Sequence, residues 1–277
     1  LAAPPGSWPP SALAFARGAF YTNGARESRG RNPGVYRLDD ATDTWLQCGF
    51  ADRPVRDLAV DGDTLYAVVG DRKTADLYRH EQDGAWTPLS ALPDYVQFLG
   101  VAQAVGYVGI GGTDGGLSLL DLATGALEPI SLPVREVDIR RVSAWVSGSD
   151  WSVSYSTAAG HSFTRYSGRS TWWTGRYGPP GYAILGLVGD SMGATAATSG
   201  GVLYQEEDMS EMWDAGGDAL PGTAAVAVAQ TGWGRTYAAT YDHGVYERGR
   251  DGWEPRNEGL PTLDVRALAT SPAARSD

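Results

Sequence analysis

Large apolar residues recur in this 277-residue chain at a nearly constant interval. Five tryptophans and one leucine mark six successive units: Trp45, Trp86, Leu127, Trp172, Trp213 and Trp253. The intervals between these markers are 41, 41, 45, 41 and 40 residues. A period of this length is typical of proteins in which similar supersecondary units stack on one another. The spacing therefore predicts a repeat architecture.

Each unit shows the same order of segments: an apolar strand, a tight turn, a second strand with a central aromatic residue, and a glycine-containing loop before a third strand. In the second unit we expect strands at residues 55–60, 64–69, 76–80 and 86–89. Residues 13–21 (LAFARGAFY) align without gaps on residues 58–66 (LAVDGDTLY). Several units end in Leu-Pro, and a proline suits the exit of an outer strand because it lacks the amide donor that a ladder needs.

A four-stranded unit of about 40 to 45 residues cannot bury both faces alone, and such units pack side by side around a centre in a β-propeller. We therefore predict an all-β fold: residues 1–277 form a single β-propeller of about six four-stranded blades, with seven possible. The expected blades span approximately residues 11–54, 55–95, 96–136, 137–182, 183–224 and 225–264. The marker tryptophans are expected to pack between blades, because large aromatic side chains are usually buried.

The end of the chain does not fit a simple six-blade ring. Residues 265–269 (VRALA) repeat residues 55–59 (VRDLA), which begin the second unit. Residues 265–277 are therefore expected to supply an extra inner strand or to close the ring. A seventh blade shared with the N-terminal tail and a partner that supplies strands both remain open.

Composition limits the functional classes. The formal net charge of −11 disfavours nucleic acid and anionic membranes as partners, since an acidic surface repels phosphates. Cys48 is the single cysteine, so no disulfide can form within the chain. The sequence contains no run of about 18 apolar residues, so we expect no membrane span. The first ten residues lack an initiator methionine and signal-peptide features, so we expect a mature terminus and a secreted, periplasmic or otherwise extracytoplasmic location.

The turns before three markers carry a further pattern: Thr42-Asp43-Thr44-Trp45, Asp83-Gly84-Ala85-Trp86 and Asp251-Gly252-Trp253. These resemble degenerate Asp-boxes of the bacterial-neuraminidase-repeat type, whose members include sialidase-like, photosystem-assembly and sortilin-like propellers. The last unit, residues 244–272, is the most similar. The resemblance implies that the Asp-box is a structural turn between third and fourth strands. Turn aspartates usually hydrogen-bond their own backbone, so we expect no catalytic role for Asp83 or Asp251.

The loops that join second to third strands, and each fourth strand to the next unit, are expected on one face of a propeller. Two of them are enlarged, at residues 23–34 and 174–182. Basic residues gather on loops of this face, which favours an anionic partner unless local carboxylates such as Glu27, Asp52 and Glu136 neutralise them. The candidate binding residues of this face are Arg26, Arg29, Arg31, Arg53, Arg72, Arg135, Arg176, Tyr177, His161, Asp242 and His243, and Lys73 lies beside them.

No catalytic set is recognisable in the sequence. The Arg-Ile-Pro-type motif of sialidases is absent: its nearest string is Asp138-Ile139-Arg140-Arg141, which lacks the proline. No Gly-x-Ser-x-Gly elbow occurs. His80, His161 and His243 are far apart and lack metal-ligand spacing, so we predict no metal and no cofactor. We expect a non-enzymatic scaffold that binds a protein or anionic partner through the enlarged-loop face. The alternative is a glycan-binding lectin, or a divergent glycoside hydrolase or lyase acting at the central channel.

Overall fold

The computed structural model describes residues 12–24, 33–71, 73–94, 96–102, 105–110, 116–132, 139–147, 150–157, 162–166, 173–175, 184–190, 193–206, 220, 224–231, 235–249, 252–258, 260 and 263–270. Within these ranges the chain contains strands and no helix. The strands form six antiparallel sheets, here numbered one to six in chain order. The expectation of an all-β protein built from antiparallel four-stranded sheets is therefore confirmed for the described residues.

In the first three sheets every strand pairs with the next one along the chain. Sheet one contains β1 (Leu13–Ala16), β2 (Ala19–Asn23), β3 (Val35–Asp39) and β4 (Thr44–Gly49). Sheet two contains β5 (Val55–Asp61), β6 (Thr64–Gly70), β7 (Ala75–His80) and β8 (Trp86–Leu92). Sheet three contains β9 (Val96–Ala102), β10 (Val105–Ile110), β11 (Gly116–Asp121) and β12 (Leu127–Ile130).

The remaining sheets follow the same meander. Sheet four contains β13 (Ile139–Ser147), β14 (Asp150–Thr157), β15 (Ser162–Tyr166) and β16 (Trp173–Gly175). Sheet five contains β17 (Ile184–Asp190), β18 (Gly193–Thr198) and β19 (Gly201–Glu206), and the fourth strand expected near Trp213 falls outside the described residues. Sheet six contains β20 (Ala225–Gln230), β21 (Thr236–Thr240), β22 (Val245–Gly249) and β23 (Gly252–Pro255).

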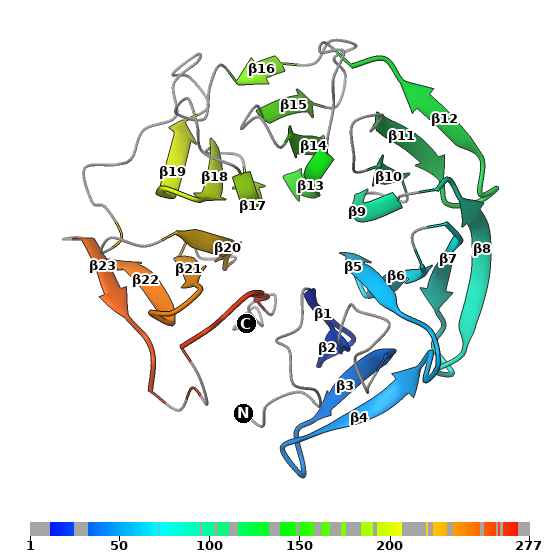
Figure 1. Cartoon of the computed structure of the whole chain (residues 1–277), viewed down its shortest axis with the longest axis horizontal. Coiled ribbons are helices and arrows are strands. Elements are labelled where there is room, and N and C mark those ends of the chain that lie inside the picture. Colours follow the sequence, from blue (N-terminus) through cyan, green and yellow to red (C-terminus); the bar gives the residue numbers. More distant parts are fainter. Residues whose placement is uncertain are drawn as a thin grey trace.

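Figure 1 shows the six sheets around a common centre, with the first strand of each nearest to it and the last strand at the periphery. Each first strand contacts the first strand of the next sheet, from β1 to β5 and onward to β20. No comparably extensive contact joins β20 back to β1 among the described strands. Residues 263–270 instead run toward the centre between sheets six and one (Figure 1).

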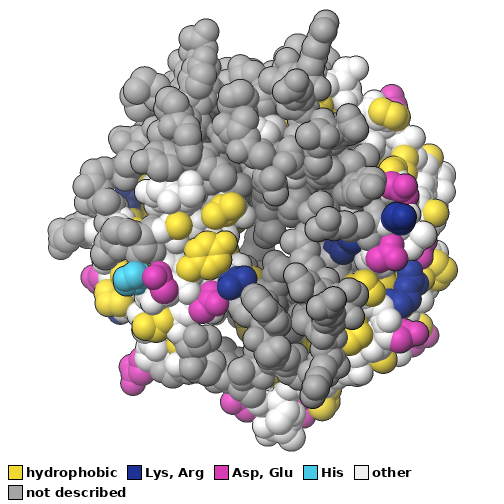
Figure 2. All heavy atoms as spheres, viewed as in Figure 1, with side chains coloured by type: hydrophobic (Ala, Val, Ile, Leu, Met, Phe, Trp, Pro, Cys, Tyr) yellow, Lys and Arg dark blue, Asp and Glu magenta, His cyan; other side chains and the backbone are white. Residues whose placement is uncertain are grey.

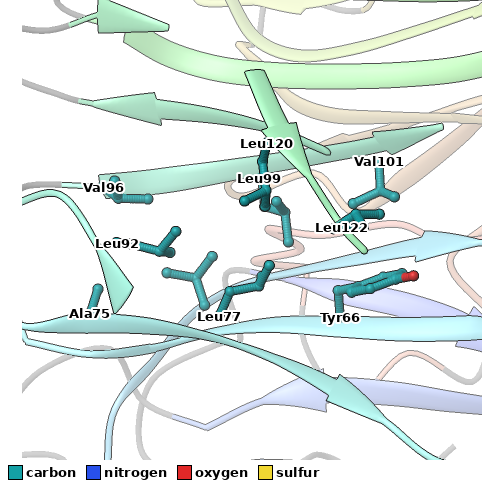
Figure 3. Close-up of a cluster of buried hydrophobic side chains, with 10 residues drawn as sticks. Tyr66, Ala75, Leu77, Leu92, Val96, Leu99, Val101, Leu120 and Leu122 are labelled. Atoms are coloured by element: carbon teal, nitrogen blue, oxygen red, sulfur yellow. The ribbon is translucent and has the colours of Figure 1, made fainter. Parts of the chain in front are cut away.

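The cores of the molecule lie between neighbouring sheets. Between sheets two and three, Leu77, Val96 and Leu120 are fully buried in a cluster of side chains from both sheets (Figure 3). Similar clusters join sheet one to sheet two and sheet five to sheet six. Since burial of apolar area is the main favourable term in folding, each sheet depends on its neighbours for stability.

The marker residues open the outer strands, as the repeat predicts. Trp86 and Leu127 are the first residues of β8 and β12, while Trp45 and Trp253 are the second residues of β4 and β23. Trp86 donates its indole N–H to the carbonyl of Cys48 in sheet one, at 3.0 Å. Trp253 stacks on Tyr204 of sheet five, with ring centroids 6.5 Å apart. The expected packing between units is thus confirmed for these two tryptophans.

Alternating strand direction gives each sheet two distinct ends. The tight turns between first and second and between third and fourth strands lie at one end, here called the turn face. The remaining connections lie at the other, here called the loop face. The loop-face ends of sheets one and two lie side by side. Asn23 at the end of β2 donates its side-chain amide to the carbonyl of Val55 at the start of β5, at 2.9 Å. Of the predicted binding residues, the described ones, Arg53, Asp242 and His243, belong to loop-face connections.

Arg17 fixes the turn face between sheets one and two. It occupies the hairpin between β1 and β2 with a φ of 50°, a conformation that costs energy for a residue other than glycine. Its guanidinium offsets this strain by donating to three backbone carbonyls of sheet two, those of Asp63, His80 and Glu81. Arg17 therefore links sheet one to sheet two through these hydrogen bonds.

Candidate binding surface

Most of the predicted binding residues lie outside the described part of the chain. This holds for Arg26, Arg29, Arg31, Arg72, Arg135, His161, Arg176 and Tyr177. The structure describes Arg53, Asp242 and His243. They belong to two connections of the loop face: Arg53 precedes β5, whereas Asp242 and His243 lie between β21 and β22.

The side chain of Arg53 is hydrogen-bonded to residues of sheet two. Its guanidinium donates to a carboxylate oxygen of Asp76 and to the hydroxyl of Tyr78, both at 2.7 Å. The hydrogen bond to Asp76 is the main cause that raises the pKa of Arg53. An arginine with these internal partners supports the connection between β4 and β5 and has little capacity left for a ligand.

The loop between β21 and β22 is rigidly built. Thr240, which is fully buried, donates its hydroxyl to the Gly244 carbonyl and accepts the amide of His243. Asn257 accepts the Val245 amide at 2.8 Å and donates to the His243 carbonyl at 3.1 Å. Gly244 has a φ of 84°, and a Cβ there would overlap the Asn257 side chain. These bonds hold residues 241–243 in a fixed, outward position.

An exposed aromatic ring stands at the tip of this loop. Tyr241 is 45% exposed, and Leu263, from the connection that follows β23, is 44% exposed. The Leu263 carbonyl accepts the Gly244 amide, so the two connections lie side by side. The guanidinium carbon of Arg266 lies 5.3 Å from the centroid of the Tyr241 ring. We call Tyr241, Asp242, His243, Leu263, Asp264 and Arg266 the Tyr241 surface.

Charge on the Tyr241 surface is locally paired. Arg266 donates from Nε and Nη2 to the two carboxylate oxygens of Asp264, each at 3.1 Å. This bidentate pairing is the main cause that raises the pKa of Arg266. Asp242 and His243 lie 2.6 Å apart through Oδ1 and Nδ1. The Tyr241 surface thus contains two exposed apolar side chains, Tyr241 and Leu263, beside two pairs of polar side chains.

Figure 2 shows the same side of the molecule as Figure 1. Hydrophobic side chains gather over the region of sheet six, and basic and acidic side chains lie directly beside them. Such a mixture is typical of protein-binding surfaces, where tyrosine and arginine are enriched among the residues that contribute most to affinity.

A polar cavity lies at the opposite, turn face. It has a volume of about 640 Å³ and is lined by Arg17, Thr64, Tyr66, Arg79, Glu81, Gln82 and Asp83. Figure 3 shows the Tyr66 hydroxyl pointing away from the apolar cluster that holds its ring. Hydrogen bonds from Arg79 and Thr87 lower the pKa of Glu81. None of the three predicted binding residues that the structure describes lines this cavity.

The aspartates of the described turns have structural partners. Asp83 accepts the amide of Ala85 at 2.9 Å, and Asp121 accepts those of Ala123 and Thr124. The last two hydrogen bonds lower the pKa of Asp121. The expectation that Asp83 stabilises its own turn is therefore confirmed. Among the described residues, no three His, Cys, Asp or Glu side chains are grouped as a metal site would require.

Comparison with known proteins shows similarity of fold alone. No protein-family model matches the chain, and no curated protein matches its sequence. Two solved structures of the extracellular domain of BT4673, a two-component or one-component system protein of B. thetaiotaomicron, match with TM-scores of 0.67 and 0.66 at 12% and 13% identity. They cover 93% and 94% of this chain, which spans only 34% and 35% of theirs.

The computationally designed protein Ika8 matches 86% of this chain and 70% of its own length, with a TM-score of 0.61 and 14% identity. These neighbours agree with an all-β fold, and two of them are extracellular domains. In the described part of the chain, no helix could span a lipid bilayer.

Proposed function

We propose that this protein is a non-enzymatic β-propeller module that binds a protein partner through its loop face. The Tyr241 surface carries the proposal, because it presents an exposed tyrosine on a hydrogen-bonded loop, beside an exposed leucine and an arginine from the neighbouring connection. Residues of these types, held in place before binding, lose little conformational entropy when a partner docks.

The arrangement of sheets supports the propeller. Sheets radiate from a shared centre in Figure 1, and residues 263–270 occupy the place between the last sheet and the first. We propose that this segment supplies an extra inner strand at that place. The turn role of Asp83 supports membership in the Asp-box repeat superfamily, whose members build such rings. The extracellular domains among the structural neighbours support an extracytoplasmic location.

The predicted basic loops extend the same proposal. Arg26, Arg29 and Arg31 belong to the enlarged loop 23–34, whose base is closed by the hydrogen bond from the Gly24 amide to the Gly34 carbonyl. On a chain with a net charge of −11, a basic loop would guide an acidic region of the partner toward the loop face. We propose that these arginines contribute to the rate of association, and that the Tyr241 surface contributes to affinity.

Co-purification under mild crosslinking tests the proposal. The tagged protein is expected to retain a stoichiometric partner from its native source, and Tyr241→Ala is expected to lose it. Leu46→Ala is the matched control, because Leu46 is equally exposed, at 46%, on outer strand β4 of sheet one. Arg26/Arg29/Arg31→Glu should weaken retention more at low salt than at high salt. Equal retention by all variants would contradict the proposal.

The turn-face cavity favours a second candidate, the binding of a glycan. It is concave and lined mainly by polar groups, an arrangement that suits a ligand rich in hydroxyl groups. A glycan array discriminates the two candidates. Saturable glycan binding that Gln82→Ala abolishes and Tyr241→Ala leaves intact would assign a ligand to the cavity.

A further inference from the structure

Residues 264–270 occupy the position of a first strand that follows sheet six. Their sequence repeats that of β5, with Val265, Leu268 and Ala269 in place of Val55, Leu58 and Ala59. The first strand of every sheet in Figure 1 lies near the centre, and this segment runs to the same region. The repeated pattern therefore continues past the sixth sheet.

The contacts of this segment with sheet six correspond to those of β5 with sheet one. The Val265 amide donates to the carbonyl of Thr240, the last residue of β21, at 3.0 Å. In sheet one the side-chain amide of Asn23, the last residue of β2, donates to the carbonyl of Val55, so the matching valine is bonded there as the acceptor. Val265 and Leu268 pack on buried side chains of sheet six, as Val55 and Leu58 pack with those of sheet one. Each segment is thus anchored to the sheet before it.

The two segments differ on their other side. β5 pairs with β6 from Val55 to Asp61, and Val55, Asp57 and Leu58 are buried. By contrast, residues 264–270 are all partly exposed and form no strand. Backbone hydrogen bonds from residues 266–269 to other described residues are absent. An anchored first strand that has no second strand among the described residues presents its backbone donors and acceptors to an incoming chain.

We propose that an extended strand of the partner protein pairs with residues 265–270 and adds a second strand to an incipient seventh sheet. The proposal rests on the proposed binding function and specifies the partner as a polypeptide strand with alternating apolar residues. Backbone pairing would supply affinity, and side-chain alternation would supply specificity. The Tyr241 surface lies at one end of the same segment, through Asp264 and Arg266, so both features would contact one partner.

Other occupants suit this position less well. The flanking residues 1–11 contain Pro4, Pro5, Pro9 and Pro10, and residues 271–277 contain Pro272. Prolines lack the amide donor that a ladder requires, so these stretches would pair poorly. In a second copy of the chain, residues 264–270 lie between that copy's own sheets six and one, as Figure 1 shows, and its body would obstruct pairing. A slender strand avoids this obstruction.

The chain itself contains a suitable probe. A synthetic, fluorescently labelled peptide of residues 62–71 (GDTLYAVVGD) copies β6, the strand that pairs with the matching sequence in sheet two. This peptide is expected to bind the full-length protein saturably. A control peptide with Tyr66→Pro and Val68→Pro should bind at least roughly tenfold more weakly, because it lacks two backbone donors.

Disulfide trapping tests the register. Asp57 pairs with Val68 in sheet two, so Ala267, which aligns with Asp57, should lie opposite Val68 of the peptide. Protein carrying Ala267→Cys should crosslink to the Val68→Cys peptide and not to the Ala67→Cys peptide, whose side chain points to the other face. The wild-type protein, which retains only Cys48, is the control for background crosslinking.

Absence of saturable binding, or equal crosslinking of both peptides, would overturn the strand proposal. A protein dimer that the peptide does not dissociate would also overturn it, since the edge would then belong to a second copy. These outcomes leave the proposed function intact if Tyr241→Ala still releases the native partner. Loss of partner specificity with normal peptide binding would instead refute the proposed function alone.

Discussion

Among the described residues, the boundary between sheets one and two has contacts on both sides, whereas the boundary after sheet six has contacts with sheet six alone. At the first boundary, Val55 and Leu58 of β5 are buried against side chains of sheet one, and the strand pairs with its own second strand, β6. At the second, residues 265–269 repeat the β5 sequence, contact sheet six and remain partly exposed. The same sequence motif therefore has two environments in one molecule.

Comparing the two segments shows which side-chain contacts of a first strand require a sheet after it. Arg56 donates to the carbonyls of Gly70 in its own sheet and Val96 in sheet three. Arg266 occupies the matching position, and its described partners are Asp264 and Tyr241 on the loop face. Where the described residues include no neighbouring strand to receive it, the arginine contributes to the Tyr241 surface.

The largest expected contrast is between two matching leucines. Leu58→Ala should destabilise the fold by about 2–5 kcal/mol, because it leaves a cavity in a closed core. Leu268→Ala should cost only about 1 kcal/mol, since its partly exposed side chain has less contact to lose. Urea unfolding of both variants measures the difference. Equal losses would mean that the two boundaries are equally closed.

A buried carboxylate gives the second contrast. Asp57 is 6% exposed and accepts the amides of Leu58 and Leu99, each at 3.0 Å, which ties sheet two to sheet three. Asp57→Ala should cost about 1–3 kcal/mol, since it leaves the buried Leu99 amide without this partner. The reverse change at the matching position, Ala267→Asp, should alter the free energy of unfolding by no more than about 0.5 kcal/mol. A larger effect at residue 267 would contradict an open boundary.

Acid sensitivity sharpens the comparison further. His80 lies between the rings of Tyr21 and Trp86 at the closed boundary, and burial, with a smaller effect of Arg17, lowers its pKa below 6.5. The native state therefore resists protonation. The contribution of His80 to stability is complete above pH 6.5 and is lost as the pH falls from 6.5 toward the lowered pKa, by at most about 1.4 kcal/mol per pH unit.

His80→Phe keeps an aromatic ring in this position and removes the titrating group. Thermal unfolding between pH 5 and pH 7, a range of about two units around the ordinary histidine pKa, should show a smaller acid loss in the variant than in the wild type. An unchanged acid loss would show that other groups cause it.

The fold was predictable to the extent that it depends on local pattern. Alternating apolar residues and the marker spacing predicted the strands of sheet two to within a few residues, and placed Trp86 and Leu127 at the starts of outer strands. Contacts across sheets were not predictable. The carbonyls that bind Arg17 lie up to 64 residues away in sequence, and no local signal identifies them.

The candidate surface was predictable only in part. Sequence reasoning selected Asp242 and His243 because they lie in a loop-face connection, and it missed Tyr241, Leu263 and Arg266. The pairing of Tyr241 with Arg266 joins two connections that meet only after sheet six has folded. Arg53 was selected as a binding residue, yet its contact with Asp76 depends on a strand pairing that composition does not reveal. A repeat of VRDLA at the chain end was the signal that could have identified Arg266.

Hydrogen–deuterium exchange of the two matching segments tests the central claim most directly. The account predicts slow exchange for the amides of residues 55–59, which are paired in sheet two, and fast exchange for those of residues 266–269 in the free protein. It also predicts that the peptide of residues 62–71 slows exchange at residues 266–269 without affecting residues 55–59. Equal protection of both segments in the free protein would contradict the claim that the boundary after sheet six is open.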